Sequence, residues 1–213
     1  MSIGSPNFNR QAKRREATRQ EILAAAWEVA DEQGIGAVTL REIAERIGMQ
    51  PPSLYSHFPS KMAIYDAMYQ QGWEEYLEVV CQLEPRLPAQ PRAALATVAA
   101  EFFDFVLAKP TRAQLMNERV VPGFVPTAQA YAPAVAALDN LRMTLTRLGA
   151  SDEAAADLFT AVLGGLVSQQ IANEPGGRRW RLLLERAVDM YADEVGMPGP
   201  RLTARTELAG SHS

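Results

Sequence analysis

Residues 50–58, Gln-Pro-Pro-Ser-Leu-Tyr-Ser-His-Phe, gather several hydrogen-bonding and aromatic side chains in a very short stretch. If this stretch is helical, Leu54 and Phe58 lie on one face, four residues apart, and anchor it inward. The remaining side chains then point outward: Ser53, Tyr55, Ser56 and His57. Such tips are suited to recognition, because they can exchange hydrogen bonds with the base edges and phosphates of a nucleic acid.

Side chains that could catalyse a reaction are scarce. The chain has two histidines, His57 and His212, and a single cysteine, Cys81. They do not show the spacing of metal ligands, and no paired carboxylates stand out. We therefore predict that the protein is not an enzyme and uses no metal or other cofactor. Carboxylate catalysis is the alternative, and turnover of a bound ligand would reveal it.

A helix is expected directly before residues 50–58. Thr39 and Glu42 fit a capping box, in which each side chain satisfies an unpaired backbone N–H of the other residue. One apolar face follows at helical spacing, formed by Leu40, Ile43, Ala44 and Ile47. Gly48 suits the left-handed end of this helix, where a Cβ would be strained.

The next helix is expected to have only six or seven residues. Gln50 can cap it, and Pro51 and Pro52 fit its first turn, where a missing N–H costs little. Pro59 ends it, because the residue before a proline avoids helical angles. Two short helices joined in this way form a helix-turn-helix, whose second helix can lie in a DNA major groove. Generic three-helix packing would explain the apolar positions but not the polar outer face.

A basic cluster lies upstream, where residues 10–19 hold a single acid, Glu16, and five cations: Arg10, Lys13, Arg14, Arg15 and Arg19. Such a cluster favours contact with phosphates, and a disordered solubilising tail is the alternative. Thr18 and Glu21 fit another capping box, which predicts a helix from about 18 to 33. Its apolar stripe consists of Ile22, Leu23, Ala26, Val29 and Ala30.

Residues 15–65 resemble the DNA-binding domain of the tetracycline-repressor (TetR) family of bacterial transcription regulators. The resemblance is carried by the long first helix, by Thr-Leu-Arg-Glu-Ile-Ala-Glu-Arg-Ile-Gly-Met and by Pro-Pro-Ser-Leu-Tyr-Ser-His-Phe-Pro-Ser-Lys. It implies an all-helical homodimer whose N-terminal domains bind a palindromic operator in double-stranded DNA. It also implies larger C-terminal domains that dimerise and usually hold a small-molecule inducer.

The resemblance further implies roles for single residues. Thr39 and Arg41 open the second helix near the DNA backbone, and Lys61 meets a phosphate at the start of the fourth helix. The implied recognition surface comprises Gln50, Pro51, Pro52, Ser53, Tyr55, Ser56 and His57. With Arg14 and Arg15 of the basic cluster, these residues make up the predicted DNA-binding set.

Composition agrees with a globular protein of one or two domains. The 213 residues are 47% hydrophobic, and the net charge of −4 is unevenly distributed. Residues 1–61 hold eight Lys or Arg and seven Asp or Glu, so the N-terminal part is slightly positive. A lone cysteine cannot form an intramolecular disulfide, and a buried, inert thiol is expected for it. No apolar run is long enough to span a membrane and no signal peptide is recognisable, which predicts a cytoplasmic protein without membrane contact.

Beyond residue 60 the pattern is helical throughout, which predicts an all-α fold of about nine helices. The further helices are expected at about 60–82, 91–108, 110–118, 128–148, 152–172 and 178–195. The predicted domains are a flexible basic N-terminal arm (1–14), a helix-turn-helix DNA-binding domain (15–61), a helical effector-binding and dimerisation domain (62–198) and a disordered tail (199–213).

Two further surfaces are predicted in the C-terminal part. Residues 158–171 are apolar nearly all round, so this helix must be covered on several sides. A homodimer interface is favoured over the core of a monomer, with Phe159, Val162, Gly165, Leu166, Gln169, Leu183, Ala187, Met190 and Tyr191 as its residues. A second set of large side chains is predicted to bind a hydrophobic small-molecule effector: Trp73, Tyr76, Phe102, Phe103, Phe105, Met116, Phe124, Tyr131 and Leu145. Ordinary core packing is the alternative for these residues.

These features predict a ligand-responsive transcriptional regulator, with a repressor favoured. An activator of the same family is one alternative. The other alternative is a helical ligand-binding or interaction protein that does not bind an operator. A mobility shift with promoter DNA would separate this alternative from an operator-binding regulator.

Overall fold

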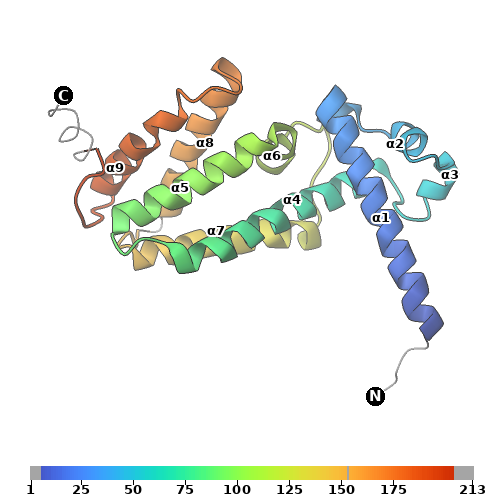
Figure 1. The fold of residues 1–213 in the computed structure, drawn as a ribbon, viewed down its shortest axis with the longest axis horizontal. Helices are drawn as coiled ribbons and strands as arrows, with labels where there is room; N and C mark the ends of the chain where they lie inside the picture. The colour runs from blue at the N-terminus through green and yellow to red at the C-terminus, as the bar shows by residue number, and fades with distance from the viewer. Residues whose placement is uncertain (1–5, 153, 204–213) are drawn as a thin grey trace. The chain divides into compact units, whose positions relative to one another are not determined.

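The structure of the chain is a computed structural model that describes residues 6–152 and 154–203. The described residues form nine α-helices and no strand, so the predicted all-α fold is confirmed (Figure 1). The helices are α1 (Pro6–Gln33), α2 (Leu40–Arg46), α3 (Pro51–Leu54), α4 (Lys61–Leu83), α5 (Pro91–Ala108), α6 (Pro110–Asn117), α7 (Ala128–Arg147), α8 (Ala155–Asn173) and α9 (Leu184–Glu194). Three 3₁₀ turns join them: η1 (Ile35–Ala37), η2 (Glu84–Arg86) and η3 (Arg181–Leu183).

The chain divides into two compact units. The first contains the described residues up to Gly72 together with Thr111–Ala132, and the second contains Trp73–Pro110 together with the described residues from Pro133 onward. The division differs from the predicted boundary after residue 61, because the first half of α4 and most of α6 belong to the same compact unit as the N-terminal helices. Close packing of α4 on α6 depends on Gly72, since a Cβ there would lie 2.8 Å from Sδ of Met116.

Helix α1 begins earlier than the sequence suggested. It starts at Pro6, so residues 6–14 of the expected flexible arm are helical, while residues 1–5 lie outside the described residues. The Thr18–Glu21 capping box is therefore wrong, because the Thr18 hydroxyl donates instead to the carbonyl oxygen of Arg14, one turn back within the helix. Arg, Lys, Gln and Ala residues, all good helix formers, extend the helix in this direction.

The core of the first unit is built on the apolar stripe predicted for α1. All five of its residues are buried, as are Ile43 and Ala44 of α2 and the anchors Leu54 and Phe58. Helix α4 adds Ile64, Tyr65 and Met68, none of which is exposed. Burial of these side chains supplies the main stabilisation of a domain whose α2 and α3 are too short to persist alone.

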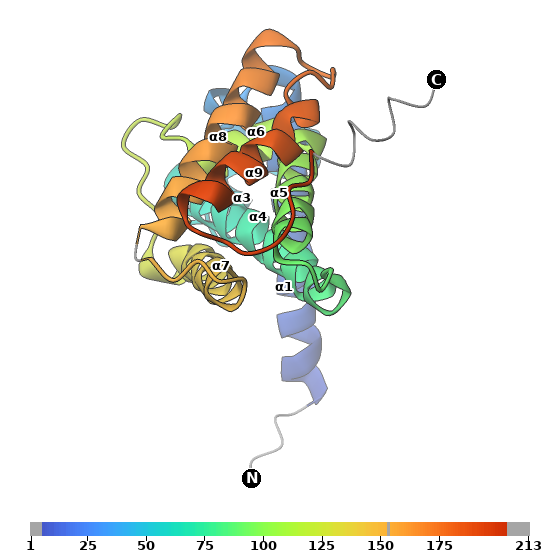
Figure 2. The same cartoon turned by 90° about the vertical axis from the view of Figure 1, so that its left-hand side faces the viewer.

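Helices α5, α8 and α9 pack side by side in the second unit (Figures 1 and 2). A largely buried ionic cluster joins α5 and α9: the Arg92 guanidinium lies 2.8 Å from Asp193 and 3.5 Å from Asp189. Asp189 also accepts hydrogen bonds of 3.0 Å from the backbone N–H groups of Leu202 and Thr203. Residues 199–203 of the expected disordered tail are thus held against α9, and residues 204–213, including His212, lie outside the described residues.

Two other expectations for the second unit differ from the structure. The helix predicted from 178 begins as the turn η3, because side chains bind the backbone N–H groups before it: Glu174 accepts from Arg179 and Gln170 from Trp180. Cys81 is exposed rather than buried. Among the described residues, no helix has the length and apolar character required to cross a membrane.

Candidate nucleic-acid interface

Helix α2 begins and ends as its sequence predicts. The Thr39 hydroxyl accepts a 3.1 Å hydrogen bond from the backbone N–H of Glu42, which is one half of the expected capping box. The Glu42 carboxylate instead accepts from the amide of Gln33. At the other end, Gly48 has a φ of +67°, and the N–H of Met49 donates to the carbonyl of Ala44. This Schellman ending turns the chain sharply toward α3.

The recognition segment, residues 50–58, consists of the four-residue helix α3 and the turn that follows it. The regular helix is shorter than predicted, ending at Leu54 rather than near residue 57. Leu54 and Phe58 are 0% and 1% exposed, so they anchor the segment as expected. Ser60, just after it, accepts a hydrogen bond from the N–H of Ala63 and thereby caps α4.

Every residue of the predicted DNA-binding set is at least partly exposed. Pro51, His57 and Lys61 are half-buried. The rest are exposed: Arg14, Arg15, Thr39, Arg41, Gln50, Pro52, Ser53, Tyr55 and Ser56. Tyr55 leaves 56% of its surface open, an unusual state for an aromatic residue that could pack into a core. The segment thus presents polar and aromatic tips while its two apolar anchors point inward.

The cations around this surface differ in the partners that their side chains contact. The Arg41 guanidinium pairs with Glu45 at 2.9 Å, and that carboxylate raises the pKa of Arg41. The Lys61 ammonium donates to the carbonyl of Gly36 at 3.2 Å and lies 5.2 Å from the centre of the Tyr65 ring. The side chains of Arg41 and Lys61 therefore already have partners within the protein, although both remain accessible from solvent.

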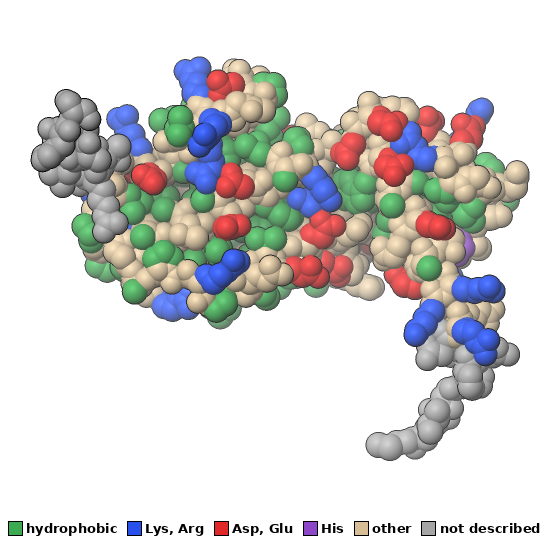
Figure 3. Space-filling view, viewed as in Figure 1, with side chains coloured by type: hydrophobic (Ala, Val, Ile, Leu, Met, Phe, Trp, Pro, Cys, Tyr) green, Lys and Arg blue, Asp and Glu red, His purple; other side chains and the backbone are tan. Residues whose placement is uncertain are grey.

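Positive charge gathers at the N-terminal end of α1 (Figure 3). Arg10, Lys13 and Arg14 are exposed, and their side chains form no hydrogen bond or ion pair in the part of the chain that the structure describes. At the opposite end of α1, Glu32 pairs with Arg46 of α2 at 2.5 Å, so that end is locally neutralised. The unneutralised cations lie where a phosphate backbone would be attracted.

Comparisons with known proteins agree with this geometry. Residues 22–68 match the family described as "Bacterial regulatory proteins, tetR family". The HTH-type transcriptional activator FasR of Mycolicibacterium smegmatis is 36% identical over 100 residues, which are 46% of this chain and 45% of that protein. The Tetracycline repressor protein class A from transposon 1721 of Escherichia coli is 43% identical over 47 residues, 22% of each chain. Residues 22–68 thus form a domain of the tetR family of bacterial regulatory proteins.

A solved structure shows that the likeness extends to the overall fold. The transcriptional regulator FadR from Bacillus subtilis, in complex with stearoyl-CoA, superposes with a TM-score of 0.65 at 18% identity. The superposition covers 81% of this chain and 96% of FadR. The sequence matches are shorter, since each spans less than half of the curated relative. These relatives are regulators of transcription rather than enzymes.

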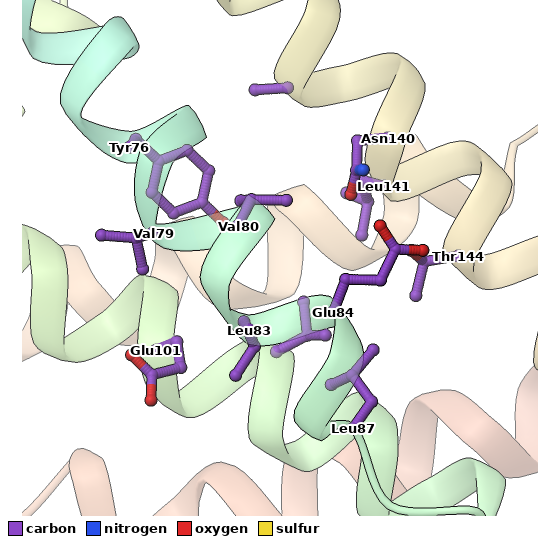
Figure 4. Close-up of a pocket in the computed structure, with 12 residues that line it drawn as sticks. Tyr76, Val79, Val80, Leu83, Glu84, Leu87, Glu101, Asn140, Leu141 and Thr144 are labelled. Atoms are coloured by element: carbon purple, nitrogen blue, oxygen red, sulfur yellow. The ribbon is translucent and has the colours of Figure 1, made fainter.

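A small cleft, with a cavity volume of about 30 Å³, lies among α4, η2, α5 and α7 in the second unit (Figure 4). Its walls are largely apolar, with two carboxylates, Glu84 and Glu101. The lining comprises Tyr76, Val79, Val80, Leu83, Glu84, Leu87, Val98, Glu101, Ala137, Asn140, Leu141 and Thr144. Burial raises the pKa of Tyr76, and the charge of Glu101 adds to the rise. The Tyr76 hydroxyl therefore stays protonated at neutral pH.

The residues predicted to bind an effector are divided among three places. Tyr76 lines the cleft, and its ring contacts Trp73, Phe102 and Phe105 at centroid distances of 5.1 to 6.0 Å. Phe103 and Leu145 are core residues that no solvent or ligand reaches, at 0% and 1% exposure. The other predicted residues belong to the first unit: Met116, Phe124 and Tyr131. There Phe124 packs on Tyr65 and Tyr69, and Tyr131 stacks on Tyr69.

Most of the cleft lining was missed by sequence reasoning. That reasoning favoured large aromatic rings, whereas the lining is mainly Val, Leu and Ala at helical spacing on three helices. The spacing of Tyr76, Val80 and Leu83 on α4 was the available signal, but it does not distinguish a cleft from a packed face.

Helix α8 exposes a continuous face of small and apolar side chains. This α8 face comprises Leu158, Ala161, Val162, Gly165, Gln169 and Ala172, all exposed except the half-buried Val162. Leu166 and Ala187 are half-buried beside it, whereas Leu183 and Met190 are exposed, Met190 at 68%. Phe159 and Tyr191 were wrongly assigned to an interface, because they are 2% and 3% exposed and their rings pack together in the core at 5.1 Å.

Proposed function

We propose that the protein is a homodimeric transcriptional regulator that binds a palindromic operator through its recognition segments. The observation that carries the proposal is the exposure of the segment's hydrogen-bonding tips while Leu54 and Phe58 fix it from within. Residues 22–68, which match the family, include this segment and α2. Short polar tips on a rigid support suit the major groove, which is wide enough to admit a helix.

Dimerisation is supported by the α8 face. An exposed apolar stripe that follows one side of a helix is costly to leave in water, and small residues allow a partner helix to approach closely. A two-fold dimer matches a palindrome, with half-sites about one helical turn of DNA apart. One short segment alone offers limited affinity, whereas two linked segments bind as a unit.

Control by a hydrophobic effector is supported by the cleft of the second unit. Its walls are mainly apolar, as expected for a site that binds an apolar ligand. FadR, a structural neighbour, is described in complex with stearoyl-CoA. A ligand can release DNA only if it binds the DNA-free state more tightly. Helix α4 is the natural connector, because this single helix begins at Lys61 and carries Tyr76 and Val80 of the cleft.

A repressor is favoured in this proposal, and an activator is the second candidate because FasR is named an activator. Repression and activation would both require the same DNA-binding surface. The bacterial cytoplasm is the proposed location, since the operator lies there.

Selection of duplexes from a random DNA pool tests the proposal directly. We expect the full chain to enrich a palindrome and to bind it with at least about a thousandfold preference over random DNA. Stearoyl-CoA added to the complex serves as the first effector probe, and fluorescence anisotropy of the labelled duplex measures release. Failure to enrich any sequence would exclude an operator-binding protein and favour a ligand-binding or interaction protein.

A further inference from the structure

Two arginines of α1, the exposed Arg15 and the half-buried Arg19, are hydrogen-bonded to the end of the recognition segment. Arg15 donates from Nη2 to the carbonyl oxygen of Ser56 at 3.1 Å, and Arg19 donates from Nη1 to the carbonyl oxygen of His57 at 2.6 Å. The Arg19 guanidinium also lies 4.1 Å from the centre of the Phe58 ring. Because Arg15 and Arg19 are four residues apart, they reach the segment from one face of α1.

The recognition segment needs such support. A helix of four residues cannot persist alone, and the last carbonyls of any helix lack partners within it. Inside the segment, Ser56, His57 and Phe58 donate their N–H groups to carbonyls of Ser53 and Leu54, which leaves the Ser56 and His57 carbonyls at its open end. Cations placed at the carbonyl end of a helix are stabilising, because the helix dipole is negative there.

The other cations of the basic cluster are not hydrogen-bonded to the recognition segment. Arg10, Lys13 and Arg14 are exposed and unpaired within the described part of the chain. The basic cluster is thus divided by the helix into an inward pair and an outward group. The sequence alone gives no sign of this division, since it depends on the helical phase of a segment expected to be partly unstructured.

We propose that Arg15 and Arg19 form a clamp that positions the recognition segment, and that phosphates are contacted instead by Arg10, Lys13 and Arg14. Arg15 and Arg19 are positioning residues, because they act on DNA through the carbonyls of Ser56 and His57. The proposal rests on the operator binding proposed above, but the clamp itself is a property of the DNA-free protein and can be measured there.

Hydrogen exchange of the DNA-free protein tests the clamp without any operator. We expect Arg19→Ala to accelerate exchange of the Ser56, His57 and Phe58 amides at least about tenfold, because hydrogen bonds from a charged donor hold the segment. Lys13→Ala is the matched control and should leave these amides unchanged. Amides of Ile43 and Ala44 in α2 report whether the domain stays folded, and Arg15→Ala, an exposed position, is the milder second variant. Unchanged exchange of the segment in both arginine variants would overturn the clamp.

The salt dependence of operator affinity separates positioning from phosphate contact. Removal of a phosphate contact lowers the slope of log K against log salt by about 1, and we expect this for Lys13→Ala. Arg19→Ala should weaken binding about tenfold at every salt concentration with the slope unchanged. Arg19→Lys keeps the charge but loses the planar group over Phe58, so it should not restore affinity. A lowered slope for Arg19→Ala, or full restoration by lysine, would show a phosphate contact. Absence of operator binding by the wild type would defeat the proposed function and leave the exchange experiment to decide the clamp.

Discussion

Two exposed surfaces of the described residues differ in almost every physical respect. The recognition segment is short, polar at its tips and flanked by cations, and two buried anchors and a pair of arginines help to hold it. The α8 face belongs to a helix of 19 residues, is apolar, and is supported by α5 and α9 along its length. The first surface can bind only a partner that supplies charge and hydrogen-bonding groups, whereas the second gains most from an apolar partner.

This difference predicts how each surface fails. A single charge on the α8 face should disrupt association, because it would be buried without a partner. A single deletion at the recognition segment should weaken binding only in part, because several tips share the contact with DNA.

Val162→Asp should have the largest effect on operator affinity. We expect the protein to become monomeric and operator binding to fall about a thousandfold, since the two half-sites would no longer be bound together. Light scattering measures the mass, and anisotropy measures the affinity. Met143→Asp, at an exposed position of α7, is the control and should leave both unchanged. A Val162→Asp protein that remains dimeric would show that the α8 face is not the interface.

Asp189→Asn tests the ionic support behind the second surface. Burial alone would raise the pKa of Asp189, but hydrogen bonds from the N–H groups of Thr203 and Leu202, the Thr203 hydroxyl and Arg92 bring it below its ordinary value of 3.8. A lowered pKa means that the ionised carboxylate stabilises the fold above about pH 4 and that this contribution is lost as the pH falls further.

The variant should therefore be less stable than the wild type by about 3 kcal/mol at pH 7, because Arg92 loses a buried partner. The difference should shrink as the pH falls below 4, where the Asp189 carboxylate of the unfolded wild-type chain takes up a proton before that of the folded protein. Urea unfolding at a series of pH values measures this difference in the free energy of unfolding. A difference that stays constant down to pH 3 would mean that Asp189 does not act through its charge.

Tyr55→Ala should weaken operator binding by roughly tenfold, the loss of one good contact among several. Ser56→Ala is the matched control. The Ser56 hydroxyl donates to the carbonyl of Ser53 at 2.7 Å, within the segment, so its removal should change affinity by less than about threefold. The two single variants are compared on the same selected duplex at one salt concentration. A larger loss of operator affinity for Ser56→Ala than for Tyr55→Ala would show that Ser56, rather than Tyr55, makes the stronger contact with DNA.

Local signals predicted the recognition segment well. The Thr39 cap, the left-handed Gly48 and the anchors Leu54 and Phe58 each depend on neighbours within four residues, and all are as expected. Most α4–α8 boundaries also follow prolines or glycines and lie within about three residues of the prediction. Such features can be inferred from sequence because they are decided locally.

Features decided by distant parts of the chain could not be predicted. The inward direction of Arg15 and Arg19 depends on the phase of α1 against α3, and the burial of Phe159 and Tyr191 depends on which side of α8 meets α9. The cleft depends on three helices that meet along their apolar faces. Helix α8 is apolar all round, so its sequence alone does not show which side is covered.

Dimethyl sulfate protection of a selected operator reports directly on whether residues 50–58 enter the major groove, because the reagent methylates guanine N7 there. We expect two protected clusters about one helical turn apart on the duplex, one for each recognition segment, and weaker protection of both clusters with Tyr55→Ala at a concentration that just saturates the wild type. Full guanine reactivity in a duplex saturated with the wild-type protein would contradict the insertion of residues 50–58 into the major groove.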